Sequence, residues 1–153
     1  MQESLEAAYA ACADTLYKIA MVYLGSPADA EDVLQDAFLK LLCRREAFQD
    51  PEHRKRWLIR VTVNLCKDRL RGFWRRRVVP FEGQIIVQDE EKQEIWEQVL
   101  AMPETYKAVM HLYYYEGYAV QEIAKILGLS TGAVKTRLHR GRKALRMEME
   151  EEP

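Results

Sequence analysis

The stretch EIAKILGLSTGAVKTRLHRGRKALR, residues 122–146, changes at its middle from an apolar helical pattern to a strongly basic one. Its first half spaces Ile123, Ala124 and Leu127 along one face of a helix. Gly128 suits the left-handed end of that helix, and Ser130 is a suitable N-cap for a second helix. The apolar face of this second helix contains Val134, Leu138 and Leu145. The stretch therefore predicts a helix-turn-helix, with Leu129 packed in the turn.

The second helix of this pair concentrates positive charge. Six lysine or arginine side chains lie between residues 135 and 146, although the whole chain has a formal net charge of −1. With the apolar face turned inward, the outward side chains include Lys135, Thr136, His139 and Arg140. A second helix of this kind can enter the major groove of DNA, so we expect it to contact DNA.

Charge alternates along the rest of the chain. Residues 1–52 contain ten acidic and four basic side chains, whereas residues 53–77 contain ten basic and one acidic. Residues 78–104 are acidic again, residues 105–147 are basic, and the tail EMEEEP contains four glutamates. The pattern favours two polyanion-binding surfaces on two modules, with an acidic face for a basic partner. Solvated helix faces are the plainer alternative for any one block.

Helical periodicity also dominates the chain before residue 78. An apolar stripe over residues 5–23 predicts a long helix that stops at Gly25. Ser26 and Pro27 mark the start of a second helix, and Asp50 and Pro51 the start of a third. The residues of the third helix expected to face inward are Trp57, Leu58, Val61 and Leu65.

The helical pattern fails between residues 78 and 93, where Pro80 and Gly83 lie and where QIIVQ is a possible short extended piece. Helices are predicted again over residues 94–102, 104–116 and 120–127. The predicted fold is all-α, with two small helical domains, residues 1–77 and 94–150, joined by a flexible linker, residues 78–93.

Several function classes find no support in the sequence. The three cysteines, Cys12, Cys43 and Cys66, form no C-x-x-C pair, which argues against zinc and disulfides and favours a reduced, cytoplasmic setting. No segment resembles a membrane span. His53, His111 and His139 lack a nearby nucleophile with an orienting carboxylate, and the carboxylates are expected at the surface. We therefore expect a protein that is not an enzyme and that needs no metal or cofactor.

Three motifs together resemble a known family. They are DAEDVLQDAFLKLL (residues 29–42), RWLIRVTVNLCKDRLR (56–71) and the segment from MPETYKAV to the basic helix (102–145). In this order they are similar to conserved regions two and four of an extracytoplasmic-function (ECF) sigma factor of the sigma-70 family. The resemblance implies a promoter-specificity subunit of bacterial RNA polymerase. One domain would read and melt the −10 element and the other would read the −35 element.

The resemblance assigns polymerase binding to the first of these motifs. The matching residues are Asp29, Glu31, Asp32, Gln35, Asp36 and Phe38. An exposed acidic helix face can meet an arginine-rich coiled coil of the polymerase. Phe38 lies on the apolar stripe, so burial in the core is preferred for it over a direct contact.

The resemblance also places a flipped −10 base against Phe48 and Asn64. An unstacked base needs an apolar wall and an amide that donates and accepts hydrogen bonds. The basic residues expected at phosphates are Arg54, Lys55, Arg56, Arg60, Lys67, Arg69 and Arg71. Trp57 is either a wedge against the duplex or a core residue. The alternative to base binding by Asn64 is a surface asparagine without a partner. The −35 contacts map to Lys135, Thr136, Arg137, His139 and Arg140.

Two other interpretations stay open. A separate helix-turn-helix repressor or activator would bind a palindromic duplex tightly without polymerase. A scaffold would bind acidic proteins or anionic membranes through residues 53–77. For the sigma-factor interpretation the expected partners are core RNA polymerase, promoter DNA as duplex and melted strand, and an anti-sigma factor, without membrane insertion.

Overall fold

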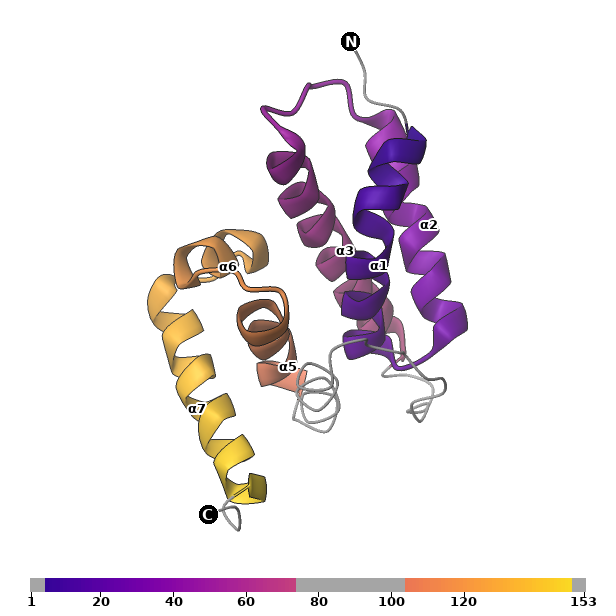
Figure 1. Cartoon of the computed structure of the whole chain (residues 1–153). Helices are drawn as coiled ribbons and strands as arrows, with labels where there is room; N and C mark the ends of the chain where they lie inside the picture. The colour runs from indigo at the N-terminus through magenta and orange to yellow at the C-terminus, as the bar shows by residue number, and fades with distance from the viewer. Residues whose placement is uncertain (1–4, 74–103, 150–153) are drawn as a thin grey trace. The chain divides into compact units, whose positions relative to one another are not determined.

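The computed structural model describes residues 5–73 and 104–149, and these residues are helical apart from short connections. They fall into two compact units, divided between Gln84 and Ile85 (Figure 1). The first unit contains α1 (Leu5–Leu24), α2 (Pro27–Cys43) and α3 (Pro51–Phe73). The second contains α5 (Glu104–Met110), the π-helix η1 (His111–Tyr115), α6 (Val120–Leu127) and α7 (Thr131–Met149). The predicted all-α class is confirmed.

Three sequence predictions fall on residues that the structure does not describe. They are the linker over residues 78–93, the short extended piece QIIVQ and the helix over residues 94–102. Among the described helices, none is both long and apolar enough to cross a membrane.

The helix boundaries of the first unit follow from local chemistry. Gly25 has a φ of 70°, which a side chain at this position would disfavour, and it ends α1. Ser26 caps α2 by accepting a hydrogen bond of 3.4 Å from the backbone N–H of Asp29. Asp50 caps α3 by accepting one of 2.7 Å from the backbone N–H of His53. The predicted starts of α2 and α3 are therefore confirmed.

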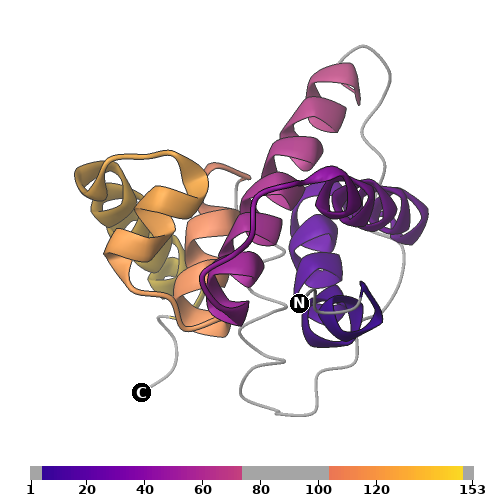
Figure 2. The same cartoon turned by 90° about the horizontal axis from the view of Figure 1, so that it is seen from above.

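Each of the three helices of the first unit contacts the other two (Figure 2). In α1 the predicted stripe is buried at its centre, where Leu16 and Ala20 have no exposed surface. In α3 the prediction was right for Leu58 but wrong for its neighbours. Trp57, Val61 and Leu65 are only half-buried. The fully buried positions of α3 are Leu58, Ile59, Thr62, Val63 and Cys66. The inner face of α3 thus lies about one residue further round the helix.

The three cysteines are free thiols in very different surroundings. Cys43 is exposed, whereas Cys12 and Cys66 are buried. Burial raises the pKa of the Cys66 thiol to about 12, although nearby Arg69 acts in the opposite direction. Burial also raises the pKa of Cys12.

The cysteines allow a direct test of this core. At pH 7.5 we expect a thiol reagent to modify Cys43 at least about a hundredfold faster than Cys12 or Cys66, because thiolate and access are both needed. Mass spectrometry of the native protein after timed labelling measures the three rates. Comparable rates at all three positions would contradict the packing of α1 against α3.

The second unit is built on the helix-turn-helix that the sequence predicts. Gly128, with a φ of 69°, ends α6 in the left-handed conformation. The backbone N–H of Leu129 then bonds to the carbonyl of Ala124 at 2.9 Å. Ser130 caps α7 by accepting a hydrogen bond of 3.0 Å from the N–H of Ala133. Val134 and Leu138 are buried as expected, and α7 packs on α5 and α6 (Figure 1).

The helix before this motif differs from the prediction. A single α-helix was expected over residues 104–116, but α5 gives way to η1 at His111. The backbone N–H of Glu116 bonds to the carbonyl of His111 at 3.0 Å, five residues back, which is the spacing of a π-turn. Gly117, with a φ of 81°, follows and ends the segment as predicted.

Candidate functional site

The face of α2 that was predicted to bind polymerase is largely accessible. Ser26 and Pro27 start this helix so that its acidic residues lie opposite the buried stripe of Ala30, Val33 and Ala37. Of the six candidate residues, Glu31, Asp32 and Gln35 are exposed, Asp29 and Asp36 are half-buried, and Phe38 is buried. The structure thus presents two carboxylates and one amide of this set openly to solvent.

The acidic face is not isolated from α3. Arg69 forms an ion pair with Asp29 at 3.2 Å and another with Asp32 at 3.6 Å. Its side chain is 31% exposed. The sequence placed Arg69 among the phosphate contacts, but its guanidinium is turned toward α2. This pairing joins residues 40 positions apart, which is why helical spacing could not predict it.

Phe38 belongs to the core, which was the preferred interpretation. It is 6% exposed, and its ring lies 5.0 Å from that of Tyr9. Two apolar residues that the sequence analysis missed lie further along α2. Leu39 is 57% exposed and Leu42 is 60% exposed. Exposed leucines that follow an acidic segment on one helix are suited to a protein partner with both basic and apolar side chains.

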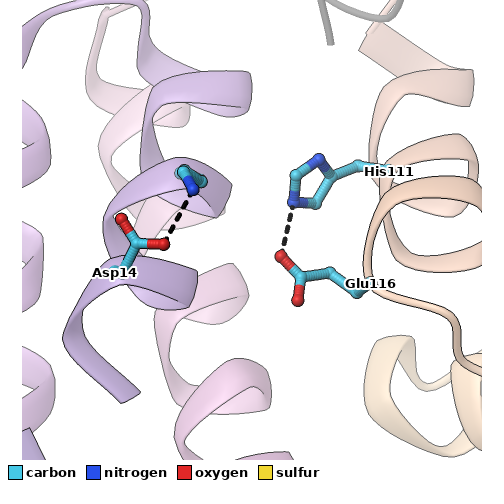
Figure 3. Close-up of polar contacts among 4 residues, drawn as sticks. Asp14, His111 and Glu116 are labelled. Atoms are coloured by element: carbon cyan, nitrogen blue, oxygen red, sulfur yellow. Dashed lines mark hydrogen bonds and ion pairs between the residues drawn. The ribbon is translucent and has the colours of Figure 1, made fainter. Parts of the chain in front are cut away.

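An open pocket of about 380 Å³ lies beside the acidic face. It is lined by Tyr9, Ala13, Asp14, Tyr17, Glu31, Leu34 and Gln35, so α1 and α2 both contribute. Burial, with a further contribution from Glu31, raises the pKa of Tyr17. Asp14, labelled in Figure 3, pairs with Lys18 at 2.7 Å. The sequence did not predict a contribution of α1 to this surface, because Tyr9 falls on the apolar stripe of that helix.

The residues predicted to meet −10 DNA, on α3 and in the loop before it, differ widely in exposure. Arg60, Asn64 and Arg71 are exposed; Phe48, Lys55, Arg56, Trp57 and Lys67 are half-buried; Arg54 is buried. Arg56 pairs with Glu52 at 3.8 Å, and Arg71 pairs with Asp68. The face that remains accessible combines the Asn64 amide with cationic side chains.

The prediction of a phosphate contact by Arg54 is inconsistent with the structure. Arg54 is 6% exposed, and its positive charge lowers the pKa of the buried Cys12 thiol against the larger effect of burial. The side chain therefore lies within the first unit, beside α1. The basic run of residues 54–56 does not form one surface, because neighbouring positions on a helix point in directions about 100° apart.

Phe48 and Trp57 lie together at the start of α3. Their ring centroids are 5.6 Å apart, and the Phe48 and His53 rings form a T-shaped pair with centroids 5.2 Å apart. Both residues are half-buried. Trp57 is therefore neither a fully buried core residue nor an exposed wedge, and the Asp50 cap that starts α3 brings it beside the loop containing Phe48.

The recognition helix α7 presents its predicted residues outward. Lys135, Thr136, His139 and Arg140 are exposed, and Arg137 is half-buried. Arg142 on the same helix instead donates a hydrogen bond of 3.1 Å to the Tyr114 hydroxyl of η1. The first four side chains form one accessible face that is suited to a DNA groove.

One histidine has a buried carboxylate partner, which corrects the expectation that carboxylates lie at the surface. Nε2 of His111 is 3.1 Å from a carboxylate oxygen of Glu116, and the two side chains are 1% and 8% exposed (Figure 3). The Tyr115 ring stacks on His111 at 4.9 Å. Within residues 5–73 and 104–149, no three His, Cys, Asp or Glu side chains are grouped to hold a metal ion.

An acidic helix face, a basic helix with an accessible amide and a basic helix-turn-helix define a DNA-binding protein with a separate protein-binding surface. Comparison with known families identifies the family to which this protein belongs. Residues 8–76 match the family described as Sigma-70 region 2, and residues 92–145 match Sigma-70, region 4. The chain belongs to the ECF group of the sigma-70 family.

Individual relatives agree with this assignment. The chain is 30% identical to the ECF RNA polymerase sigma factor SigW of Bacillus subtilis, over 89% of this chain and 83% of that protein. It is also 30% identical to the RNA polymerase sigma factor SigV of the same organism, over 89% and 85%. The solved structure of the sigma factor RpoE bound to the anti-sigma factor NepR from Bartonella quintana has a TM-score of 0.69, 20% identity and 92% coverage of each chain.

Proposed function

We propose that this chain directs bacterial RNA polymerase to promoters through two modules with separate tasks. In this proposal residues 1–77 bind core polymerase and read and melt the −10 element, residues 94–150 read the −35 element, and residues 78–93 connect them. The observation that carries the proposal is the opposite charge of two accessible helix faces in one unit. The face of α2 exposes Glu31 and Asp32, whereas α3 exposes Arg60 and Arg71.

The polymerase surface extends over both α1 and α2. Its acidic part attracts a basic partner and sets the orientation of docking more than it adds affinity. The pocket lined by Tyr9 and Tyr17, and the exposed Leu39 and Leu42, would add apolar contacts. Aromatic side chains are enriched at the centres of protein–protein interfaces, and polar side chains form the rims.

The DNA surfaces divide into single-stranded and duplex recognition. Asn64 would hold an unstacked base, with Phe48 and Trp57 as its aromatic surroundings and the accessible cations of α3 at phosphates. On α7, arginine or lysine would read guanine edges and Thr136 would contact a thymine methyl group.

Regulation by an anti-sigma factor is part of the same proposal. The sigma factor RpoE of similar fold was solved in complex with the anti-sigma factor NepR. We infer that a comparable inhibitor binds the present chain and covers its polymerase surface. The protein would act in the cytoplasm, where it meets the polymerase, as a specificity subunit without catalytic activity of its own.

The central experiment is reconstitution. The purified chain is mixed with sigma-free core polymerase and a pool of randomised duplexes, and initiated transcripts are sequenced. We expect transcripts that start at a fixed distance from two shared sequence elements. Failure to bind core polymerase, or tight binding to a palindromic duplex without it, would contradict the proposal.

The recognition helix allows a more local test. Replacing Arg140 by alanine is expected to weaken −35 recognition by about 1–3 kcal/mol, the usual contribution of an arginine that reads a base edge. Band-shift titrations of the holoenzyme on promoters with native and substituted −35 elements measure this loss. Arg142→Ala is the matched control, because Arg142 bonds to Tyr114 instead. An equal loss of −35 discrimination in both variants would contradict the assignment.

A further inference from the structure

The guanidinium of Arg44 lies over two aromatic rings at the end of α2. Its central carbon is 4.3 Å from the centroid of the Phe48 ring and 5.0 Å from that of Trp57. The two centroids are themselves 5.6 Å apart. The three planar groups therefore form one compact cluster, which we call the Arg44 cluster. Each of the two cation–ring distances is within the roughly 6 Å of an attractive cation–π contact.

Backbone and side-chain hydrogen bonds hold this cluster in place. Arg44 is the C-cap of α2, and its Nε donates a hydrogen bond of 3.1 Å to the carbonyl of Glu46. On the other side of the loop, the backbone N–H of Gln49 donates one of 3.1 Å to Nδ1 of His53, whose ring forms a T-shaped pair with Phe48. The loop between α2 and α3 is thus fastened at both ends, and the guanidinium has a defined orientation.

We propose that Arg44 determines specificity in −10 recognition by offering its guanidinium plane as the surface on which the unpaired base stacks. The inference rests on the proposed function, in which Phe48 borders the site of that base. Because Arg44 covers the Phe48 ring, a base entering this site meets the guanidinium before it meets the ring. Arg44 is half-buried, so it retains an accessible side.

The chemistry favours a base over a phosphate as the ligand of this side chain. A phosphate needs only a positive charge, and the neighbouring Arg45 is exposed and can supply it. A guanidinium held over the Phe48 ring, with Trp57 beside it, instead offers a base a further planar group on which to stack. Unpaired bases stack on arginine planes as they do on aromatic rings.

The test measures the coupling between Arg44 and the base. A forked DNA is made from a promoter that the wild-type holoenzyme selects out of a randomised pool, with the non-template strand single-stranded across the −10 element. Each −10 nucleotide is replaced in turn by an abasic one. We expect Arg44→Ala to weaken holoenzyme binding to the intact fork about tenfold, a change of about 1.4 kcal/mol. With the sensitive nucleotide abasic, wild type and variant should bind equally within about twofold.

Two further variants separate stacking from charge and from folding. Arg44→Lys keeps the charge but lacks the plane, so it should lose the base-dependent binding as Arg44→Ala does. Arg45→Ala removes a charge from the same loop and should weaken intact and abasic forks by the same factor. Core polymerase affinity of each variant, measured in parallel, reports an intact first unit.

The outcomes distinguish this inference from the proposed function. If the wild-type holoenzyme discriminates the base and Arg44→Ala discriminates it equally well, the inference about Arg44 is wrong and the proposed function stands. The inference is also wrong if Arg44→Ala weakens intact and abasic forks alike. If no abasic substitution affects the wild-type holoenzyme, −10 reading by the first unit is wrong, and the inference fails with it.

Discussion

Replacing Asp32 by lysine is expected to weaken binding to core RNA polymerase by tenfold or more, a change of about 1.4 kcal/mol or more in binding free energy. The side chain is 58% exposed on the acidic face of α2, beside the pocket that α1 helps to form. A lysine there would repel the basic partner that this face is proposed to meet, and such reversals slow association most strongly at low salt. Fluorescence titration of labelled chain with core polymerase at two salt concentrations measures the effect.

The ion pair with Arg69 requires its own control. Arg69 lies 3.6 Å from the Asp32 carboxylate, so Asp32→Lys also replaces this attraction by repulsion between two cations. Arg69→Gln removes the internal pairing but leaves the acidic face intact. Asp68→Lys reverses an exposed carboxylate on α3 and changes net charge equally. We expect both controls to bind core polymerase within about threefold of the wild type, the scale of a surface ion pair. A loss in Arg69→Gln as large as in Asp32→Lys would show that the α2–α3 contact matters instead.

The parts of the fold that the sequence predicted are those controlled by local chemistry. Ser26, Asp50 and Ser130 cap the helices they were expected to cap, because a short side-chain acceptor needs only the N–H group three residues later. Gly128 ends α6 as expected, since only the left-handed region fits that turn. The division of the chain at residues 77 and 94 stays a prediction, because the connecting segment lies outside the described residues.

Most of the errors concern interactions between residues that are distant in sequence. The burial of Arg54 and the turn of Arg69 toward Asp29 depend on how α3 packs against α1 and α2. The pocket between α1 and α2 has the same origin. The π-turn at His111 is a local feature. It was missed because carboxylates were expected at the surface, whereas Glu116 is buried beside His111. Helical spacing identifies which residues share a face, but not which face another helix covers.

The second large effect is expected at the −10 element. Asn64→Ala should slow promoter opening by about tenfold to a hundredfold, because each 1.4 kcal/mol of lost transition-state stabilisation slows a step tenfold. Asn64 is exposed on α3, and its neighbours Val61 and Leu65 are half-buried. An amide beside apolar surface can bond to the edge of an extruded base, which alanine cannot do. Stopped-flow fluorescence of a probe in the −10 non-template strand measures opening by the reconstituted holoenzyme.

The controls for Asn64 separate base recognition from polymerase binding and from duplex affinity. Core polymerase affinity and closed-complex formation on duplex DNA should stay within about twofold of the wild type, because Asn64 carries no charge and neutralises no phosphate. Arg60→Ala, one turn earlier on the same helix, is the matched contrast. It removes an exposed charge, so its effect should shrink as salt rises, whereas the effect of Asn64→Ala should not. Opening at the wild-type rate in Asn64→Ala, with core binding intact, would exclude this amide from −10 melting.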